Sequence, residues 1–212
     1  MSRPVVYGAD YSVYVRIVRL ALHEKGVDYE LIPVDVFAEG GPPAWYRDHH
    51  PFGRIPAFEH DGFRLYETTA IARYVDEAFD GPALQPADAR DRAVMNQIVA
   101  MIDAYAYRAM VWDVYVERID RPAEGKPSDE AVVTAGLDKS RTCLSALAQL
   151  KAPGDWLLGE QLTLADLHFA PIVDYFLKTP EGRELFAEYS TLLEWWQRVS
   201  VRSSFKATAK AG

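Results

Sequence analysis

The side chains with the clearest potential for chemistry are polar groups that stand where helices are expected to begin. Ser12 separates a short apolar run from a helical pattern, and Glu67 and Thr68 directly follow a second apolar run. The first turn of a helix carries unpaired backbone N–H groups and the positive end of the helix dipole, so a hydroxyl there can help to hold an anion. A serine in such a place more often only caps its helix, so both interpretations of Ser12 are kept at this point.

A predicted hairpin lies directly before Glu67 and positions it. Asp61 and Gly62 separate two short apolar runs, and this pair favours a two-residue turn in which both central residues have positive φ. We therefore expect strands over residues 55–60 and 63–66. Pro56 stands at the first of them, where it cannot donate to a strand ladder and suits an edge position or a cis peptide bond. A cis bond would turn the neighbouring backbone outward.

The rest of the pattern divides the chain into a mixed first half and a helical second half. The first half predicts the order strand, helix, strand, helix, strand, strand, helix, over residues 4–8, 13–25, 29–36, 44–47, the hairpin and 68–79. Such alternation implies a thioredoxin-like mixed sheet with helices on its faces. After a boundary near residues 80–88, helices are expected over 89–118 and 129–150, and another begins at Thr163 with Asp166 as its reciprocal cap.

Composition limits the function classes. The 212 residues are 49% hydrophobic and 25% charged, which is typical of a globular protein of one domain or two small ones. The net charge of −8 disfavours nucleic acids and anionic membranes as partners. No apolar run has the length of a membrane span and no signal-peptide core follows Met1, so a cytoplasmic protein is expected. Cys143 is the only cysteine, and no Cys/His spacing suggests a metal site.

Several segments, in this order and spacing, resemble glutathione S-transferases of the phi-like, serine-type class. The run HPFGRIPAF over residues 50–58 carries the similarity together with residues 7–12, 15–26, 28–31, 65–71, 128–133 and 162–168. The resemblance implies a thioredoxin-like glutathione-binding domain of order βαβαββα over residues 1–80, a linker at about 81–88, and an all-helical domain over 89–212 that contributes the electrophile pocket. It also implies a homodimer that uses glutathione as cosubstrate and needs no metal.

By this resemblance, the Ser12 hydroxyl activates glutathione. The glutathione thiol is comparable to free cysteine, whose pKa of about 8.5 leaves it mostly protonated at neutral pH. A hydroxyl that donates to the sulfur favours the thiolate, and lowering the pKa by about two units requires about 2.7 kcal/mol. One charge-assisted hydrogen bond and a helix-dipole contribution can supply that amount. The proline that often neighbours this serine in the class is absent here.

Tyr7 is the alternative to Ser12. Other transferase classes use a tyrosine near the end of the first strand, and Tyr7 stands at about that place. A tyrosine in a buried strand is more often part of the core. We therefore expect Ser12, and not Tyr7, to supply the hydroxyl.

Four further residues match the family's glutathione site. Glu67 and Thr68 match the Glu-Ser pair that holds the γ-glutamyl end, with threonine in place of serine. Arg54 matches the residue that reaches the charged ends of the peptide. Ile55 matches the residue whose backbone pairs with the cysteinyl backbone. A capping role for the Glu67-Thr68 pair is compatible with binding, since both use the same helix start.

The chain departs from the phi-like pattern upstream of this site. Phi-like proteins usually carry basic residues there for the glycine carboxylate, whereas this chain has Gly41 and Pro42. Three residues are candidates to replace them: Arg47, His49 and His50. The alternative is that glutathione binds weakly. His50 also stands where the class usually has an asparagine.

The electrophile pocket is expected from the helical half. Val111 and Tyr115 are four residues apart and so share a helix face, and together with Tyr175 they match family positions that line the pocket. Core packing is the commoner role of such residues, and it applies equally to Trp112 and Cys143.

The sequence thus predicts a glutathione transferase that conjugates the glutathione thiolate to apolar electrophiles. Holding the thiolate and bringing it to a reactive partner is sufficient chemistry. The alternatives are a glutathione-dependent peroxidase or isomerase that uses the same site, and a non-catalytic ligand-binding or scaffold protein of the same fold. The Gly41-Pro42 departure keeps the non-catalytic alternative open.

Overall fold

The computed structural model of the chain describes residues 2–209. Contacts group them into two compact units. Unit 1 comprises the chain up to Gln85 together with the described residues from Arg202 on, and unit 2 comprises Pro86–Val201.

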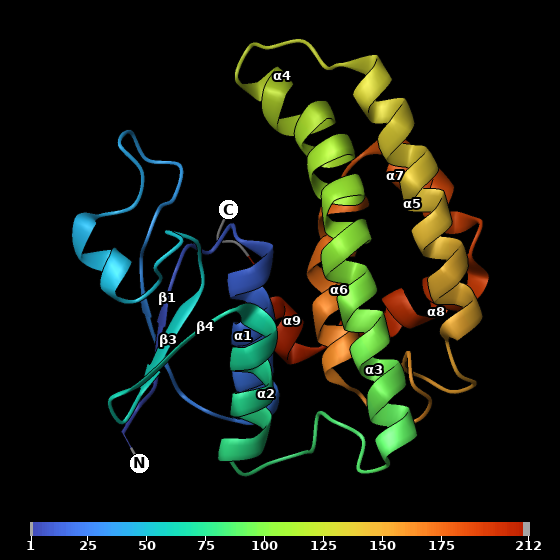
Figure 1. Cartoon of the computed structure of the whole chain (residues 1–212). Helices are drawn as coiled ribbons and strands as arrows, with labels where there is room; N and C mark the ends of the chain where they lie inside the picture. Colours follow the sequence, from blue (N-terminus) through green and yellow to red (C-terminus); the bar gives the residue numbers. More distant parts are fainter. Residues whose placement is uncertain (1, 210–212) are drawn as a thin grey trace. The chain divides into compact units, whose positions relative to one another are not determined.

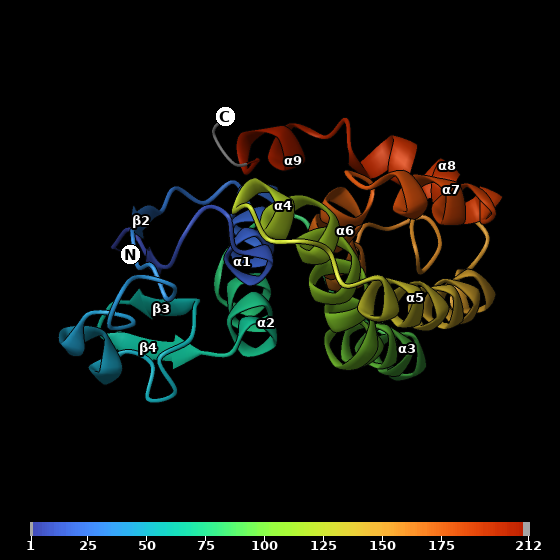
Figure 2. The same cartoon turned by 90° about the horizontal axis from the view of Figure 1, so that it is seen from above.

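Unit 1 is built on a four-stranded mixed sheet (Figure 1). Its strands are β1 (Val5–Tyr7), β2 (Glu30–Ile32), β3 (Ala57–His60) and β4 (Phe63–Tyr66), in the order β2-β1-β3-β4. β1 is parallel to β2 and antiparallel to β3, and β3 is antiparallel to β4. The helices α1 (Val13–Glu24) and α2 (Thr68–Ala78) lie side by side along one face, as Figures 1 and 2 show. A 3₁₀-helix, η1 (Ala44–Asp48), lies on the other face.

The hairpin and the mixed sheet confirm the sequence prediction. Asp61 has φ 50° and Gly62 φ 79°, as the two-residue turn requires, and the Ile55–Pro56 peptide bond is cis. The first strand of the hairpin begins at Ala57, two residues later than expected. β2 is also shorter than the predicted 29–36, since it ends at Ile32. Hydrogen bonds to the end of β1 nevertheless continue past Pro33, because the N–H of Gly8 donates to the carbonyl of Ile32 at 3.0 Å and the N–H of Val34 donates to the carbonyl of Gly8 at 3.2 Å.

The described residues from Arg202 on pack in unit 1 against α1, although the sequence assigned them to the helical domain. Arg202 forms a two-pronged ion pair with Glu24, with N···O distances of 2.8 and 2.6 Å. Arg16 is buried, donates to the carbonyl of Phe205 at 3.0 Å, and places its guanidinium 4.0 Å from the centroid of that ring. The short helix α9 (Ser203–Ala207) thereby covers the middle of α1.

A buried ion pair fixes the end of α2. The Lys25 ammonium donates to the Asp76 carboxylate at 3.2 Å and to the carbonyl of Pro82 at 3.2 Å. The same carboxylate accepts from the backbone N–H of Leu84 at 2.7 Å. The segment that leaves unit 1 is therefore bound to the ends of both helices.

Unit 2 is entirely helical. A long rod runs through α3 (Ala89–Met101), the π-helical segment η2 (Ile102–Asp120) and α4 (Arg121–Ala123). It is followed by α5 (Glu130–Leu150), α6 (Leu164–Phe176), α7 (Pro180–Ala187) and α8 (Ser190–Val199). α5 packs closely on η2 at Gly136, where a side-chain Cβ would lie 2.7 Å from the Cβ of Asp113. α6 is apolar on nearly all sides and forms the centre of the unit.

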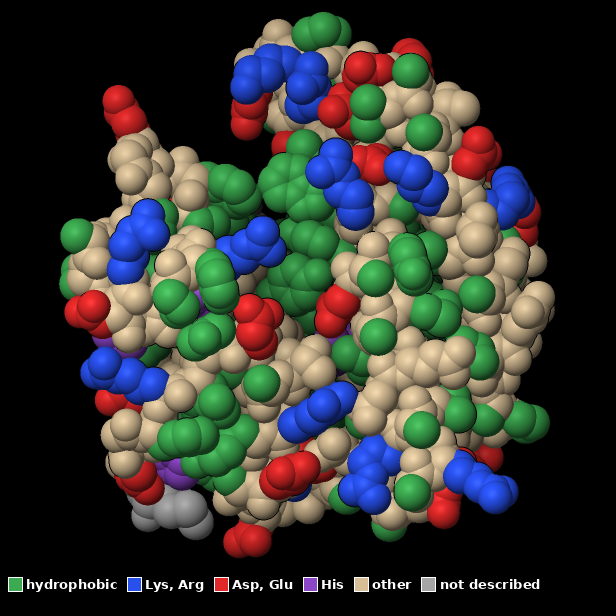
Figure 3. Space-filling view, viewed as in Figure 1, with side chains coloured by type: hydrophobic (Ala, Val, Ile, Leu, Met, Phe, Trp, Pro, Cys, Tyr) green, Lys and Arg blue, Asp and Glu red, His purple; other side chains and the backbone are tan. Residues whose placement is uncertain are grey.

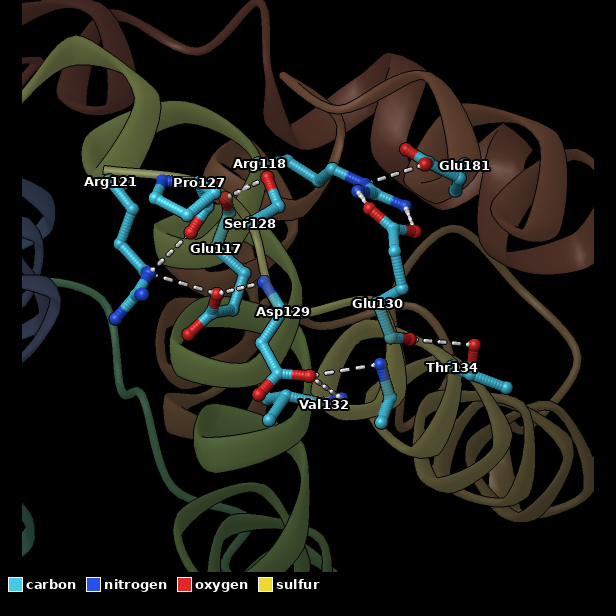
Figure 4. A network of polar contacts seen from close by, with 11 residues as sticks. Glu117, Arg118, Arg121, Pro127, Ser128, Asp129, Glu130, Val132, Thr134 and Glu181 are labelled. Atoms are coloured by element: carbon cyan, nitrogen blue, oxygen red, sulfur yellow. Dashed lines mark hydrogen bonds and ion pairs between the residues drawn. The ribbon is translucent and has the colours of Figure 1, made fainter. Parts of the chain in front are cut away.

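The loop between α4 and α5 is held by a polar network (Figure 4). Arg118 pairs with both oxygens of Glu130, at 2.6 and 2.8 Å, and with Glu181 at 2.7 Å, so it joins η2, α5 and α7. Glu117 accepts from the N–H of Asp129 at 2.9 Å and from Arg121 at 3.1 Å. These contacts hold the end of η2 to the start of α5.

The surface carries charges of both signs. On the face drawn in Figure 3, basic and acidic side chains are interspersed over each unit, so this face offers no broad basic surface. None of the helices in residues 2–209 combines the length and apolar character that crossing a bilayer would take.

The expected reciprocal cap at the start of α6 is confirmed and extends further than the sequence suggested. The buried Asp166 carboxylate accepts four hydrogen bonds. They come from the N–H and hydroxyl of Thr163 at 2.7 and 3.0 Å, the N–H of Leu157 at 2.8 Å and the indole N–H of Trp195 at 2.8 Å. Burial raises the pKa of this carboxyl, and the hydrogen bonds act against that rise.

We expect Asp166→Ala to lower the free energy of unfolding by about 3–5 kcal/mol, because it leaves buried donors from three segments without an acceptor. Urea unfolding followed by far-ultraviolet circular dichroism measures this. Asp138→Ala, an exposed aspartate of α5, is the control and should change the free energy by less than about 0.5 kcal/mol. Equal losses in the two variants would contradict the role given to Asp166.

Candidate functional site

Ser12 is the N-cap residue of α1. Its Oγ accepts from the backbone N–H of Val15 at 3.3 Å, and its backbone is extended, with φ −76° and ψ 125°. The hydroxyl proton has no acceptor among the described residues. One hydroxyl can therefore cap the helix with its lone pair and donate its proton to a ligand, so the two interpretations of Ser12 do not exclude each other.

Gly8 allows α1 to begin so close to the sheet. A Cβ at this position would lie 2.3 Å from Cγ2 of Val15 and 3.4 Å from the Cβ of Ile55. Any side chain here would push the helix start away from β1. The same close approach places Ile55 beside the β1–α1 corner that carries Ser12.

Tyr7 belongs to the core of unit 1. Only 8% of it is exposed, and it packs with Val34, Tyr46 and Ala57. Its ring centroid lies 4.4 Å from that of His49. Burial, reinforced by the nearby Glu59, raises the pKa of Tyr7. A core role therefore accounts for this tyrosine.

The β4–α2 corner presents Glu67 and Thr68. Glu67 has φ 72° and ψ 114°, a conformation that L-residues rarely adopt and that tends to occur at ligand sites. Its exposed carboxylate neither caps α2 nor pairs with another described residue. Thr68 is buried at the first position of the helix. A free carboxylate thus stands next to the N–H groups that begin α2, which suits a ligand with both an ammonium and a carboxylate group.

The turn before β3 presents Arg54. The phenol of Tyr46, which is fully buried in η1, donates to the carbonyl of Arg54 at 2.8 Å. The guanidinium itself is exposed and has no partner among the described residues. Arg47 lies close by, since its Nη1 would be 3.9 Å from a Cβ added at Gly53. Two exposed guanidiniums therefore flank one short turn.

Strand register brings these corners together at one end of the sheet. Ala57 pairs with Tyr7 on one side and with Tyr66 on the other. The end of β1, the start of β3 and the end of β4 therefore meet, and with them Ser12, the Arg54-Ile55 pair and Glu67. The strand register thus brings these candidate residues to the same end of the sheet. Gly41 and Pro42 carry no charge that could take part.

Two positions were missed by the sequence prediction. Tyr46 holds the Arg54 backbone, and Tyr11 donates to Asp35 at 2.7 Å, which helps to order the loop after β2. Burial and this hydrogen bond raise the pKa of Tyr11. Neither role has a signal in the sequence, because each depends on a partner 8 or 24 residues away.

The predicted pocket residues of unit 2 are brought together in part. Tyr115 and Tyr175 form an edge-to-face pair with ring centroids 4.6 Å apart, and the Lys178 ammonium lies 4.4 Å from the Tyr175 centroid. Burial raises the pKa of Tyr115. Val111 is buried on η2. Within residues 2–209, no three His, Cys, Asp or Glu side chains converge in a way that could hold a metal ion.

Comparison with known proteins points to one family over most of the chain. Two profiles of one family match, "Glutathione S-transferase, N-terminal domain" over residues 6–83 and "Glutathione S-transferase, C-terminal domain" over residues 101–202. Glutathione S-transferase F13 of Arabidopsis thaliana is 29% identical over 202 residues, which are 94% of this chain and 92% of that protein.

Solved structures are similar over the same length. Glutathione transferase F2 from Populus trichocarpa superposes with a TM-score of 0.86 at 28% identity, covering 97% of this chain and 96% of that one. A glutathione S-transferase from Methylobacillus flagellatus KT with GSH bound gives a TM-score of 0.79 at 27% identity, covering 98% and 100%.

Replacing Glu67 by alanine should weaken glutathione binding by about 1–3 kcal/mol, because an ammonium contact is lost while the fold keeps its contacts. Isothermal titration calorimetry measures the affinity. Glu77→Ala, an exposed glutamate further along α2, serves as the matched control and should bind as the unmodified protein does. Unchanged affinity in Glu67→Ala would rule out this corner as the γ-glutamyl site.

Proposed function

Because the chain belongs to the glutathione S-transferase family, we propose that it uses the Ser12 hydroxyl to hold glutathione as its thiolate for attack on an apolar electrophile. The observation that carries this proposal is the meeting of three corners at one end of the sheet, with the free proton of Ser12 at one of them. Glu67, Thr68, Arg54 and Ile55 hold the tripeptide beside it.

The charges of the site complement those of glutathione. The tripeptide carries two carboxylates and one ammonium at neutral pH. Glu67 is a free carboxylate that suits the ammonium, and Thr68 with the start of α2 suits the γ-glutamyl carboxylate. The guanidinium of Arg54 is free for the remaining negative charge. The glycine end of the peptide then points toward η1.

The reaction needs little beyond this arrangement. The Ser12 O–H donates to the sulfur and favours the thiolate, whose lone pair forms the new carbon–sulfur bond. The electrophile expels a leaving group or takes a proton from water after addition. Position and thiolate formation are the contributions of the protein. Val111, Tyr115 and Tyr175 are our candidates for the surface that receives the electrophile.

Arg47 is our candidate for the cation that replaces the basic residues absent at Gly41 and Pro42. Arg47 belongs to η1 and lies beside Gly53. Gly53 is the residue directly before Arg54. His49 is less suited, because its ring packs against Tyr7 in the aromatic cluster. Its Nε2 also lies 3.8 Å from the Glu59 carboxylate.

We propose a homodimer in the cytoplasm. Phe52, which is 70% exposed, and Tyr66 lie with ring centroids 6.2 Å apart on unit 1. Large apolar side chains exposed together favour a protein interface.

The alternatives use the same site. A glutathione-dependent peroxidase or isomerase would need the same thiolate, so the substrate decides between them and conjugation. A non-catalytic binder would hold glutathione without lowering the pKa of its thiol.

Ser12→Ala should raise the pKa of bound glutathione by about one to two units and slow conjugation accordingly, with much less effect on affinity. The thiolate is titrated by its ultraviolet absorbance, and conjugation is measured with an activated aryl halide. Loss of the helix cap also costs about 1 kcal/mol of stability, so unfolding is recorded in parallel. Tyr7→Phe is the control and should affect packing only.

Two outcomes would overturn this assignment. If Tyr7→Phe abolishes the thiolate and Ser12→Ala retains it, the tyrosine is the activating group. If neither variant changes the thiolate in a protein that still binds glutathione, the non-catalytic alternative is favoured.

Arg47→Ala should weaken glutathione binding about tenfold, because the glycine carboxylate loses a charged partner. The ethyl ester of glutathione at the glycine end lacks this carboxylate charge, so Arg47→Ala should not weaken its binding. Calorimetry with both ligands measures the difference. Arg90→Ala, an exposed arginine of unit 2, is the control. A variant that still prefers the free acid as strongly as the unmodified protein would assign the role elsewhere.

A further inference from the structure

His50 is buried within the turn that leads into the candidate glutathione site. Only 2% of the residue is exposed. Its N–H donates to the carbonyl of Tyr46 at 3.0 Å, and its carbonyl accepts from the N–H of Gly53 at 2.9 Å. The residue therefore connects η1 to the segment that carries Arg54.

The imidazole of His50 contacts aromatic rings from separate segments. Its centroid lies 4.9 Å from that of Tyr66, the last residue of β4, 6.1 Å from Phe52 and 6.4 Å from Tyr46. Tyr66 directly precedes Glu67 in the chain. The ring thus packs between the Arg54 turn and the β4–α2 corner, the two segments that would hold opposite parts of glutathione.

The Nδ1 atom of His50 is buried and has no hydrogen-bond partner among the described residues. A neutral ring with its proton on Nε2 places only a lone pair there. A protonated ring would place an N–H donor and part of a positive charge among aromatic side chains, with nothing to accept the hydrogen bond. The surroundings therefore accept the neutral form and disfavour the cation.

We propose that neutral His50 is a positioning residue that holds the Arg54 turn against the β4–α2 corner, and that its protonation loosens this contact and weakens glutathione binding in mildly acidic solution. The inference rests on the proposed function, because glutathione is its ligand. His50 acts through the two segments and does not touch the reacting sulfur.

The charged and titratable groups around His50 come from each element packed against it. They are the phenols of Tyr46 and Tyr66, the guanidinium of Arg54 and the carboxylate of Glu67. Burial lowers the pKa of His50, Arg54 lowers it further, and Glu67 acts in the opposite direction. Burial is the largest of the three effects.

The direction of the pH effect follows from this lowered pKa. A histidine whose pKa is lowered in the ordered site stabilises that site fully above the ordinary value of about 6.5, and the stabilisation is lost as the pH falls below it. Glutathione bears negative charge and would attract the cation. That attraction is weak, because it acts through exposed groups in water. The cost of an unpaired positive charge on the buried His50 ring is larger. The net effect of acid is therefore weaker binding.

The test measures the affinity for S-methylglutathione between about pH 7.5 and 5.5. This thioether has no thiol to titrate, and its amino and carboxyl groups keep their charges over the range. We expect the unmodified protein to lose about three- to tenfold in affinity on acidification, and His50→Asn to bind with an affinity that hardly changes with pH. His23→Asn, an exposed histidine of α1, is the matched control and should keep the pH dependence.

A second measurement needs no variant. Nuclear magnetic resonance titration of the His50 imidazole should give a lower pKa with S-methylglutathione bound than without it, because proton and ligand binding are reciprocal. A pKa that is unchanged or raised by the ligand overturns the inference, as does a pH dependence that persists in His50→Asn. A protein that does not bind S-methylglutathione even at about pH 7.5 instead refutes the proposed function, and the inference with it.

Discussion

Register within the unit 1 sheet determines where the candidate site forms. Ala57 pairs with Tyr7 of β1 and with Tyr66 of β4, so the ends of three strands coincide. A shift of one residue in either ladder would turn every side chain of the shifted strand to the other face of the sheet and separate the corners. The hairpin turn at Asp61 and Gly62 fixes one ladder, and the packing of Tyr7 and Ala57 in one cluster fixes the other.

The polar side chains of the site keep groups free for a ligand, because the helix capping and the backbone hydrogen bonds that the fold requires do not use those groups. Ser12 caps α1 through its lone pair and keeps its proton. The side chain of Glu67 takes no part in capping α2 and remains available at a strained corner. Tyr46 binds the Arg54 backbone and leaves its guanidinium exposed. Buried residues therefore position the backbone, and the exposed side chains that follow them are left for a ligand.

In unit 2, one buried carboxylate fixes how the central helix packs against its neighbours. Asp166 joins the start of α6, the loop at Leu157 and Trp195 of α8. The apolar α6 could pack in several rotations around its axis, since nearly all its faces are hydrophobic. Four directed hydrogen bonds at its first turn select one of them. Tyr175 is thereby placed against Tyr115 of η2.

The local elements could be predicted from the sequence because their causes lie within a few residues. Ser12 and Gly26 bound α1, the Asp61-Gly62 pair forms its turn, and Thr163 with Asp166 begins α6. The candidate site residues were predicted from their spacing and from resemblance, and the strand register then brought those of unit 1 to one end of the sheet.

Other features were decided by the tertiary structure alone. The burial of His50 between Tyr46 and Tyr66, the bond from Tyr46 to Arg54, and the packing of α9 on Arg16 each join segments that the local pattern does not relate. Propensity and periodicity act over one or two turns of chain, whereas these contacts depend on which surfaces remain to be covered once the sheet and helices have packed.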